Sequence, residues 1–244
     1  MLILESVIGH RGACAYAPEN TMASFMKAYE LGCRWIEFDV MCSQDGVPFI
    51  IHDDTLTRTT NGKGKVGQVS ADYLKGLDAG LWFSKSFAKE PIPLLVDLIQ
   101  WIDAMGMCAN VEIKPFSGTE RETTQTVLSL LNHYWPANKS GLLISSFSWE
   151  VLLYCKSIAP HRPLGFLLHK WDSSWFEKAQ QLHCYSVHLN HKILTNERVK
   201  QIKNKGYRVC AYTVNKKKRA QQLLSWGVDS IFSDYPGLLK ASSA

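Results

Sequence analysis

The sequence predicts an α/β fold, a (β/α)8 barrel of the TIM type, on three observations. Apolar runs with strand propensity alternate with amphipathic helical runs over most of the chain, a pattern typical of parallel strands joined by crossover helices. We count nine candidate strands, and Val47–Ile51 follows the preceding strand with no helix between them, so it should be antiparallel and leave eight strands to close a barrel. The length of 244 residues is typical of a single-domain barrel. An open doubly wound sheet is the main alternative.

The chain begins with a short apolar run, Ile3–Ile8, which we predict to be the first strand. Asn20 or Thr21 should cap the first helix, because both residue types accept hydrogen bonds from the free N–H groups of a first helical turn. Apolar residues then recur with the i, i+3, i+4, i+7 spacing of a helix, and Gly32 should end it.

The stretch Trp35–Asp53 combines a strand, a tight turn and a second extended run. Residues i and i+2 of a strand point to the same face, so the carboxylates of Glu37 and Asp39 should converge. The turn at Gln44-Asp45-Gly46 lets the two runs pair, which should bring His52 roughly opposite Asp39. Two carboxylates and an imidazole would then share one mouth of the barrel.

Residues 54–93 are polar and Gly-rich, and they resemble an insertion after this hairpin rather than another strand–helix repeat. We therefore predict one domain over residues 1–244, with 54–93 as a small inserted subdomain folded over one end of the core. The isolated aromatic residues of this segment are Tyr73, Trp82, Phe83 and Phe87.

From residue 94 onward, helices and strands alternate to the end of the chain. The predicted strands are Cys108–Ile113, Leu142–Phe147, Leu164–Leu168, Ser186–Asn190, Arg208–Thr213 and Ser230–Ser233. The predicted helices include Leu94–Met105, Trp149–Ile158, Asn196–Lys205 and Lys216–Trp226. Gly206 and Gly227 are the expected C-caps of the last two.

The composition is that of an ordinary globular protein: apolar residues make up 46%, charged residues 20%, and the net charge is +5. This mild positive charge fits an anionic substrate. The one basic cluster, residues 216–219, should be the solvated start of a helix, so we predict no nucleic-acid partner.

The seven cysteines include no CxxC pair, so they indicate neither a zinc site nor a disulfide framework, and most should be small core residues. The first residues lack the basic segment of a signal peptide, and no apolar run is long enough to span a bilayer. We therefore expect a cytoplasmic protein with no membrane partner.

Ionisable side chains gather at the ends of three predicted strands, where barrels of this kind carry their active sites. They are His10, Arg11, Glu37, Asp39, Glu112 and Lys114, and the hairpin returns His52 to the same rim. Two like charges 4 Å apart repel by about 4 kcal/mol at an effective dielectric constant of 20. Three carboxylates in one mouth therefore require a cation, and oxygen donors favour Mg²⁺ or Ca²⁺ over zinc.

Each of these features has a structural interpretation when taken alone. An E-x-D pattern occurs by chance on exposed strand faces, and Asp53 and Asp54 are most simply turn formers. His188 ends a later strand with no visible partner, and we assign it a structural role. The functional interpretation depends on the joint placement of the ionisable residues at strand ends.

Eight short motifs are spread over nearly the whole chain, from about His10 to Pro236. They are H-R-G at His10–Gly12, P-E-N-T at Pro18–Thr21, E-F-D-V at Glu37–Val40, I-H-D at Ile51–Asp53, R-T-T-N-G at Arg58–Gly62, D-A-G-x-W at Asp78–Trp82, E-I-K-P at Glu112–Pro115 and Y-T-V-N at Tyr212–Asn215. Together they resemble the glycerophosphodiester phosphodiesterase family, most closely its cytoplasmic bacterial branch.

The resemblance implies a (β/α)8 barrel with a small insertion after the H-D motif. It also implies hydrolysis of glycerophosphodiesters, such as glycerophosphocholine or glycerophosphoethanolamine, to sn-glycerol 3-phosphate and an alcohol, with one divalent cation. Carried over residue by residue, it implies a set of roles: metal ligands Glu37, Asp39 and Glu112, an acid–base pair His10 and His52, and phosphate-binding Arg11 with Lys114 close to it.

Two other functions stay open at this point. A related barrel phosphodiesterase could act on lysophospholipids or phosphoinositides, with Trp82, Phe83 and Phe87 as an apolar wall for acyl chains. A catalytically silent barrel could bind a phosphate ester as a sensor, although no histidine or carboxylate of the set is missing. The roles of the two histidines as acid or base, a cyclic phosphate intermediate and a homo-oligomeric state also stay open.

Overall fold

A computed structural model describes residues 2–237. In this part of the chain the strands form one nine-stranded sheet, and its strands β1 and β2 also pair with each other, which closes the sheet into a barrel. One strand, β3 (Pro48–Ile50), is antiparallel to its neighbour, and the others are parallel. The parallel strands are β1 (Val7–Gly9), β2 (Trp35–Cys42), β4 (Cys108–Ile113), β5 (Leu142–Ser146), β6 (Leu164–Leu168), β7 (Ser186–Asn190), β8 (Arg208–Tyr212) and β9 (Ser230–Ser233). The predicted (β/α)8 barrel is confirmed, and the open sheet is excluded.

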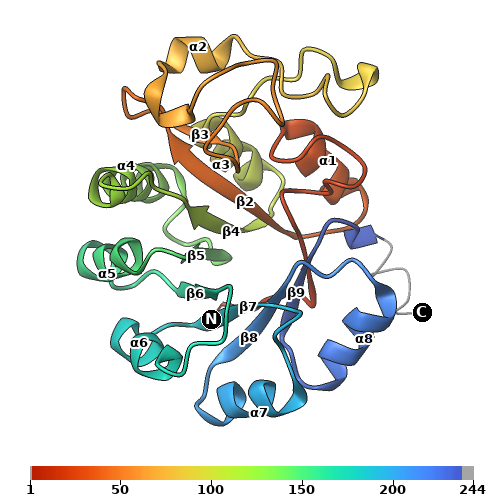
Figure 1. The fold of residues 1–244 in the computed structure, drawn as a ribbon, viewed down its shortest axis with the longest axis vertical. Coiled ribbons are helices and arrows are strands. Elements are labelled where there is room, and N and C mark those ends of the chain that lie inside the picture. Colours follow the sequence, from red (N-terminus) through yellow and green to blue (C-terminus); the bar gives the residue numbers. More distant parts are fainter. Residues whose placement is uncertain (1, 238–244) are drawn as a thin grey trace.

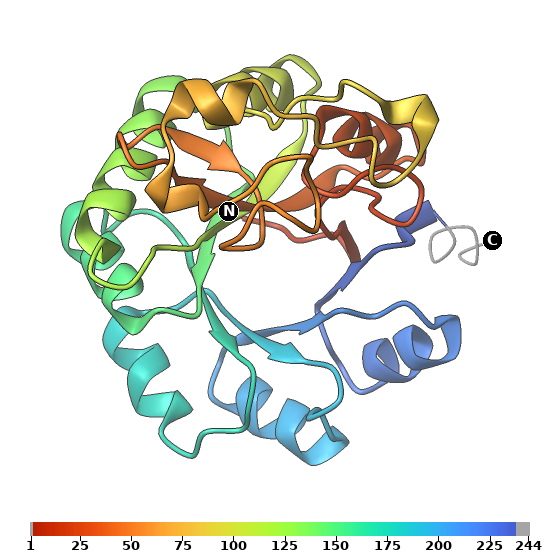
Figure 2. The same cartoon turned by 45° about the horizontal axis from the view of Figure 1, so that its top comes forward.

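Helices form an outer ring around these strands (Figure 2). They are α1 (Met22–Glu30), α3 (Leu95–Ala104), α4 (Glu120–Tyr134), α5 (Trp149–Ile158), α6 (Trp175–Leu182), α7 (Asn196–Asn204) and α8 (Lys217–Ser225). Thr21 caps α1 by accepting a hydrogen bond from Ser24 N–H, which settles the choice between Asn20 and Thr21. Gly206 and Gly227 have positive φ values just beyond α7 and α8, as expected of C-caps. Among the described helices, none has a long enough apolar stretch to cross a bilayer.

Among the predicted element boundaries, the start of the first strand is the least accurate. The sequence predicts a strand over Ile3–Ile8, but the strand begins only at Val7, because β9 pairs with Val7 to Gly9 and offers no ladder partner before them. Ile3 is 76% exposed. The other predicted boundaries differ by little at the element ends, where fraying makes the limits of an element indistinct.

The alternation of side chains along β2 separates the core from the barrel mouth. Ile36 and Phe38 belong to the main hydrophobic cluster, which lies between the strands and the outer helices. Trp35 belongs instead to a small cluster with residues of β1, β5, β8 and β9, inside the barrel. Glu37 and Asp39 share the face of Trp35, so they also face the interior, nearer the C-terminal ends of the strands.

Residues 54–93 contain α2 (Ala71–Lys75) and two short 3₁₀ segments, Val66–Gln68 and Lys85–Phe87. Figure 1 shows this segment, orange to yellow, on the side of the barrel formed by β2 and β3. A separate buried cluster joins it to the hairpin and contains Met41, Phe49, Ile51, Leu56, Val66, Ala71, Leu74, Ala79 and Ile92. Apolar burial therefore holds the hairpin, and the residues directly after it, in a fixed position.

Candidate active site

Three acidic side chains meet at the C-terminal ends of β2 and β4. Asp39 and Glu112 are direct partners in the parallel ladder, and Glu37 lies two residues before Asp39 on the same face. One carboxylate oxygen from each side chain lies within 4.8 Å of the other two. Glu37 is 4% exposed and Asp39 1%, so water screens their repulsion poorly.

Burial and mutual repulsion shift the pKa values of these groups apart. Burial and the charge of Asp39 raise the pKa of Glu112 to about 8, and burial with the charges of Asp39 and Glu112 raises the pKa of Glu37. Burial also opposes ionisation of Asp39, but the charges of Arg11 and Lys114 outweigh it and lower the pKa of Asp39 to about 2. The protein's own cations therefore neutralise the cluster only in part.

The donor set fits a hard divalent cation. Asn110 is the ladder partner of Glu37, and its amide oxygen is buried with no hydrogen-bond partner in the part of the chain that the structure describes. A buried polar atom without a partner is costly. Carboxylate and amide oxygens are the ligands that Mg²⁺ and Ca²⁺ take in proteins. One such cation would satisfy the orphaned oxygen and offset the repulsion among the carboxylates.

Arg11 joins the end of β1 to this acidic cluster. Its backbone N–H donates to Glu37 at 2.9 Å, from a left-handed conformation with φ of 50° that is uncommon for a non-glycine residue. Its guanidinium lies 2.7 Å from a Glu19 oxygen and 3.4 Å from an Asp39 oxygen. Lys114 places its Nζ 3.7 Å from the other oxygen of Asp39. Both predicted basic residues therefore adjoin the carboxylates.

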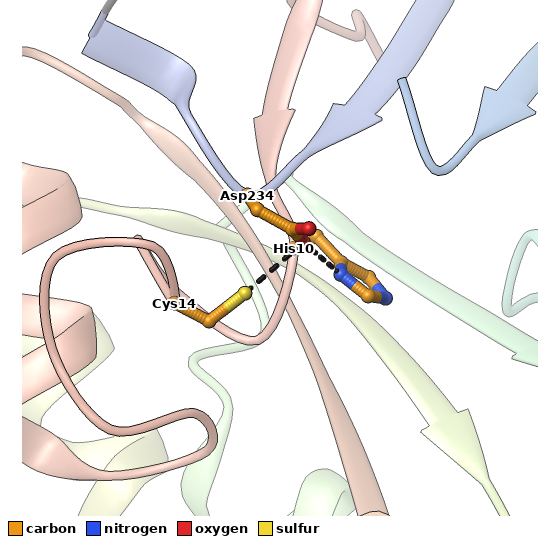
Figure 3. A group of neighbouring side chains, drawn as sticks. All are labelled: His10, Cys14 and Asp234. Carbon is orange, nitrogen blue, oxygen red and sulfur yellow. Dashed lines mark hydrogen bonds and ion pairs between the residues drawn. The ribbon is translucent and has the colours of Figure 1, made fainter. Parts of the chain in front are cut away.

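Figure 3 shows the carboxylate of Asp234, which follows β9 directly, between His10 and Cys14. His10 Nδ1 lies 2.6 Å from Asp234 Oδ1, and Cys14 Sγ donates to the same oxygen at 3.0 Å. Asn215 Nδ2 donates to the second oxygen. Burial opposes ionisation of Asp234, but the hydrogen bond and charge of His10 outweigh it and lower the pKa of Asp234 to about 2.

These contacts determine how His10 is presented. An ionised Asp234 holds the proton on Nδ1 of the imidazole and leaves Nε2 available for proton transfer. Cys14 could serve with these two side chains as a metal ligand, but separations of 2.6 and 3.0 Å are those of hydrogen bonds. We interpret the group as a hydrogen-bonded cluster that orients the ring.

His52 has a separate carboxylate partner. Its Nδ1 lies 2.6 Å from Asp53 Oδ1, and Arg58 Nε donates to Asp53 at 2.5 Å. Arg58 also donates to both oxygens of Glu19, at 2.7 and 2.8 Å, and Glu19 in turn accepts from Arg11. Burial lowers the pKa of His52, and the hydrogen bond from Arg58 lowers that of Asp53. A continuous chain of contacts thus joins the hairpin histidine to the phosphate-binding candidate.

A cavity of about 450 Å³ opens at this end of the barrel. The predicted site residues that line it are His10, Arg11, Glu37, His52 and Glu112. Asp39 and Lys114 are not part of its lining but contact each other, and Asp39 belongs to the carboxylate cluster. The structure therefore brings all the predicted site residues together.

The aromatic residues of the 54–93 segment do not reach this cavity. Trp82, Phe83 and Phe87 are absent from its lining among the described residues. Phe83 instead packs edge-on against both of the others, with ring centroids 5.6 and 5.7 Å apart. The apolar wall that they could have offered to an acyl chain is not found there.

Two carboxylates beside the histidines were not predicted as site residues. The position of Asp53 in the sequence favours a turn, yet its side chain accepts hydrogen bonds from His52 and Arg58. Asp234 is separated from His10 by 224 positions, so no local spacing connects them. The available signal for Asp234 was an acidic residue directly after the last strand, at the rim that carries active sites in this fold.

Comparison with known proteins decides the family. The model of the glycerophosphoryl diester phosphodiesterase family matches residues 10–238. The chain belongs to this family. Its membership confirms the resemblance found in the motifs and the predicted class of enzyme, a phosphoric diester hydrolase.

Individual relatives match over nearly the whole chain. A glycerophosphodiester phosphodiesterase of Caldanaerobacter subterraneus is 34% identical over 233 residues, which are 96% of this chain and 95% of the relative. One of Bacillus subtilis is 33% identical over 95% of this chain and 84% of its own. A phosphodiesterase of Oleispira antarctica, solved in complex with the product sn-glycerol-3-phosphate, has a TM-score of 0.95 and 39% identity, covering 98% of this chain and 96% of that one.

Proposed function

We propose that this enzyme hydrolyses glycerophosphodiesters to sn-glycerol 3-phosphate and an alcohol, and that it needs one divalent cation, Mg²⁺ or Ca²⁺. The observation that carries the proposal is the joint placement of two histidines, Arg11 and the cluster of three carboxylates, two of which line the same cavity. The sn-glycerol-3-phosphate found in the Oleispira structure supports it.

Glu37, Asp39 and Glu112 would hold the cation in this proposal. When bound, the cation supplies positive charge that stabilises the phosphoryl oxygens as negative charge builds on them. Arg11 adds a guanidinium whose fork suits a phosphate group, and Lys114 adds a further positive charge beside Asp39. Glu19 holds the Arg11 guanidinium from the other side, which limits its motion.

His10 and His52 would be the acid–base pair. One imidazole takes the proton from the attacking hydroxyl, either water or the 2-hydroxyl of the glycerol, and the other protonates the departing alcohol. Each ring has its Nδ1 held by a carboxylate, Asp234 or Asp53, so Nε2 is free to exchange a proton with the substrate. Attack by the 2-hydroxyl would produce a cyclic phosphate, which phosphorus NMR during turnover would detect.

The assay that tests the function measures sn-glycerol 3-phosphate released from a panel of glycerophosphodiesters. We expect no release after EDTA treatment and recovery when Mg²⁺ or Ca²⁺ is restored. Release that EDTA does not reduce would contradict the metal requirement. Binding of the diesters without release, in the presence of either cation, would favour a silent barrel that senses phosphate esters.

We do not propose lysophospholipids as the main substrates. Trp82, Phe83 and Phe87, the aromatic residues that could have formed a wall for acyl chains, lie outside the cavity. The apolar side chains that do line it, Phe147, Leu167, Tyr212 and Phe232, alternate with the polar His169, His191 and Lys192. The rates on glycerophosphocholine and lysophosphatidylcholine should therefore favour the first. A faster rate on the lysophospholipid would reverse this choice.

We also propose one domain over residues 1–244, with 54–93 as an inserted subdomain, and a cytoplasmic location. The buried cluster shared by the 54–93 segment and the β2–β3 hairpin supports the single domain, because the apolar side chains of each part are buried against those of the other. Six of the seven cysteines, Cys14, Cys42, Cys108, Cys155, Cys184 and Cys210, are free thiols, which supports a reducing compartment. Limited proteolysis that releases the 54–93 segment in a folded form would contradict the first point.

A further inference from the structure

The cavity extends from the carboxylates to the loops that follow β5–β8, where its chemistry changes. The side chains on this side include Phe147, His169, His191, Lys192, Tyr212 and Thr213. Apart from Glu37 and Glu112, no described acidic residue lines the cavity. A substrate that places its phosphate at the carboxylates must direct part of its remaining structure along this wall.

The turn over residues 190–194, directly after β7, carries Lys192 at the cavity and is firmly held. The backbone N–H of Lys192 donates to Asn190 Oδ1 at 3.0 Å. Arg219 donates to two carbonyl oxygens of the turn, and Arg198 donates to a third at 2.5 Å. Two guanidiniums therefore anchor the backbone from which the Lys192 side chain extends.

The three cations at this turn have no carboxylate partner. Within residues 2–237, none of Lys192, Arg198 and Arg219 forms an ion pair, and the Lys192 Nζ makes no hydrogen bond. Burial lowers the pKa of the adjacent His191, and the charges of Arg219 and Lys192 lower it further. The imidazole of His191 is therefore uncharged near neutral pH and can exchange a hydrogen bond with a ligand. We call Lys192, together with the His169 and His191 side chains that line the cavity with it, the cationic corner, after the charge of Lys192.

The alcohol portions of different diesters differ in charge, so they would interact differently with this corner. Phe147 and Tyr212 meet edge to face, 5.9 Å apart, and two aromatic rings can attract an ammonium group. The positive charge of Lys192 opposes that attraction. An anionic group instead gains a charge-assisted hydrogen bond from Lys192 without any acidic side chain of the corner to repel it.

We propose that the cationic corner binds the alcohol portion of the diester and selects alcohols that carry a further anionic group, a phosphate monoester or a carboxylate, over alcohols that carry a quaternary ammonium. This inference rests on the proposed function, since it assigns the substrate class of the same cavity. The glycerol half is common to all the substrates, so a change at a site that held glycerol would alter kcat/KM equally for all of them. A change at a site for the alcohol would alter kcat/KM by different amounts for different alcohols.

The test compares kcat/KM for glycerophosphoinositol 4-phosphate, which is anionic in its alcohol, with kcat/KM for glycerophosphocholine. We expect the wild-type enzyme to favour the anionic substrate by about tenfold, the scale of one charge-assisted hydrogen bond. Lys192→Glu should abolish or invert this ratio, and Lys192→Arg should retain most of it. Lys200→Glu is the matched control: it makes the same charge change at an exposed position of α7, but Lys200 does not line the cavity, so the ratio should not change.

The outcomes separate this inference from the proposed function. The inference would be overturned if Lys192→Glu lowered kcat/KM equally for both substrates, or if the wild-type enzyme had no preference between them. Turnover of the diesters would still uphold the proposed function in either case. Calorimetric titration of both diesters in EDTA provides a readout that needs no turnover. A binding preference that depends on Lys192, in a protein that hydrolyses neither diester, would uphold the inference and overturn the function.

Discussion

The two sides of the barrel mouth differ in how their charges are satisfied. On the side formed by β9, β1, β2, β3 and β4, which we call the carboxylate half, Arg11 contacts Glu19 and Asp39, and each histidine has its own carboxylate. At the cationic corner, Lys192 has no such partner among the described residues. The carboxylate half is therefore preorganised for a reaction common to all substrates, whereas the corner leaves a charge for the ligand to satisfy.

The largest expected effects come from removing the two imidazoles of the carboxylate half. His10→Ala and His52→Ala should each lower kcat by about 10³-fold or more, because general acid–base catalysis commonly contributes 10²- to 10⁴-fold. The release of sn-glycerol 3-phosphate measures this effect. His161→Ala, at an exposed position, should leave turnover unchanged. Near-normal turnover in either of the first two variants would remove that histidine from the acid–base pair.

Asp234→Asn tests whether the contact between the Asp234 carboxylate and His10 contributes to catalysis. We expect kcat to fall by about 10²-fold, because the amide keeps a similar shape but loses the charge that holds the proton on His10 Nδ1. The pH profile of kcat should change as well. Cys14→Ser is the matched control, since Cys14 donates to the same oxygen without carrying its charge. Equal rates and profiles in both variants would show that the carboxylate has only a structural role.

His188 lies on the other side of the mouth and, unlike His10 and His52, has no carboxylate partner among the described residues. Its effect should therefore appear in the stability of the protein. It is completely buried, its Nε2 lies 2.8 Å from Ser186 Oγ, and burial lowers its pKa to about 3. Below pH 6.5 the unfolded chain therefore binds a proton that the folded protein excludes, and stability decreases as the pH falls. This contribution amounts to about 2 kcal/mol between pH 6.5 and 5.

Urea unfolding of His188→Gln over this pH range measures that loss. The variant should lose stability less steeply with falling pH than the wild type does. His161→Gln, which removes an exposed histidine, should retain the wild-type slope. The same slope in all three proteins would contradict a buried, uncharged His188.

The smallest effect should come from the outer part of the carboxylate half. Arg58 bridges Asp53 and Glu19, but its side chain is 44% exposed, and solvent weakens such pairs. We expect Arg58→Lys to lower kcat by about tenfold or less, because an ammonium cannot make both bidentate contacts. Lys63→Ala, an exposed change in the same segment, should have no effect. A loss as large as that of His52→Ala would mean that Arg58 contacts the substrate.

The part of the carboxylate half on the β2–β3 hairpin could be predicted because its geometry is local. The two-residue period of a strand places Glu37 and Asp39 on one face. The hairpin register places Ile51 opposite Asp39, so the predicted position of His52 was wrong by one residue, although His52 still lines the cavity. The contact between His10 and Asp234 could not be predicted, because it depends on the closure of the barrel by β9 and β1. The cationic corner also depends on tertiary contacts, since Arg198 and Arg219 reach its turn from α7 and α8.

The most direct test of the carboxylate half is the cation-dependent release of sn-glycerol 3-phosphate by Glu112→Gln beside the wild-type enzyme. Both proteins are treated with EDTA and then titrated with Mg²⁺ or Ca²⁺. The wild-type enzyme should recover full activity. The variant, which loses one of the three carboxylates, should require a much higher cation concentration and reach a lower rate. Recovery of both proteins at the same cation concentration and to the same rate would contradict the proposed site.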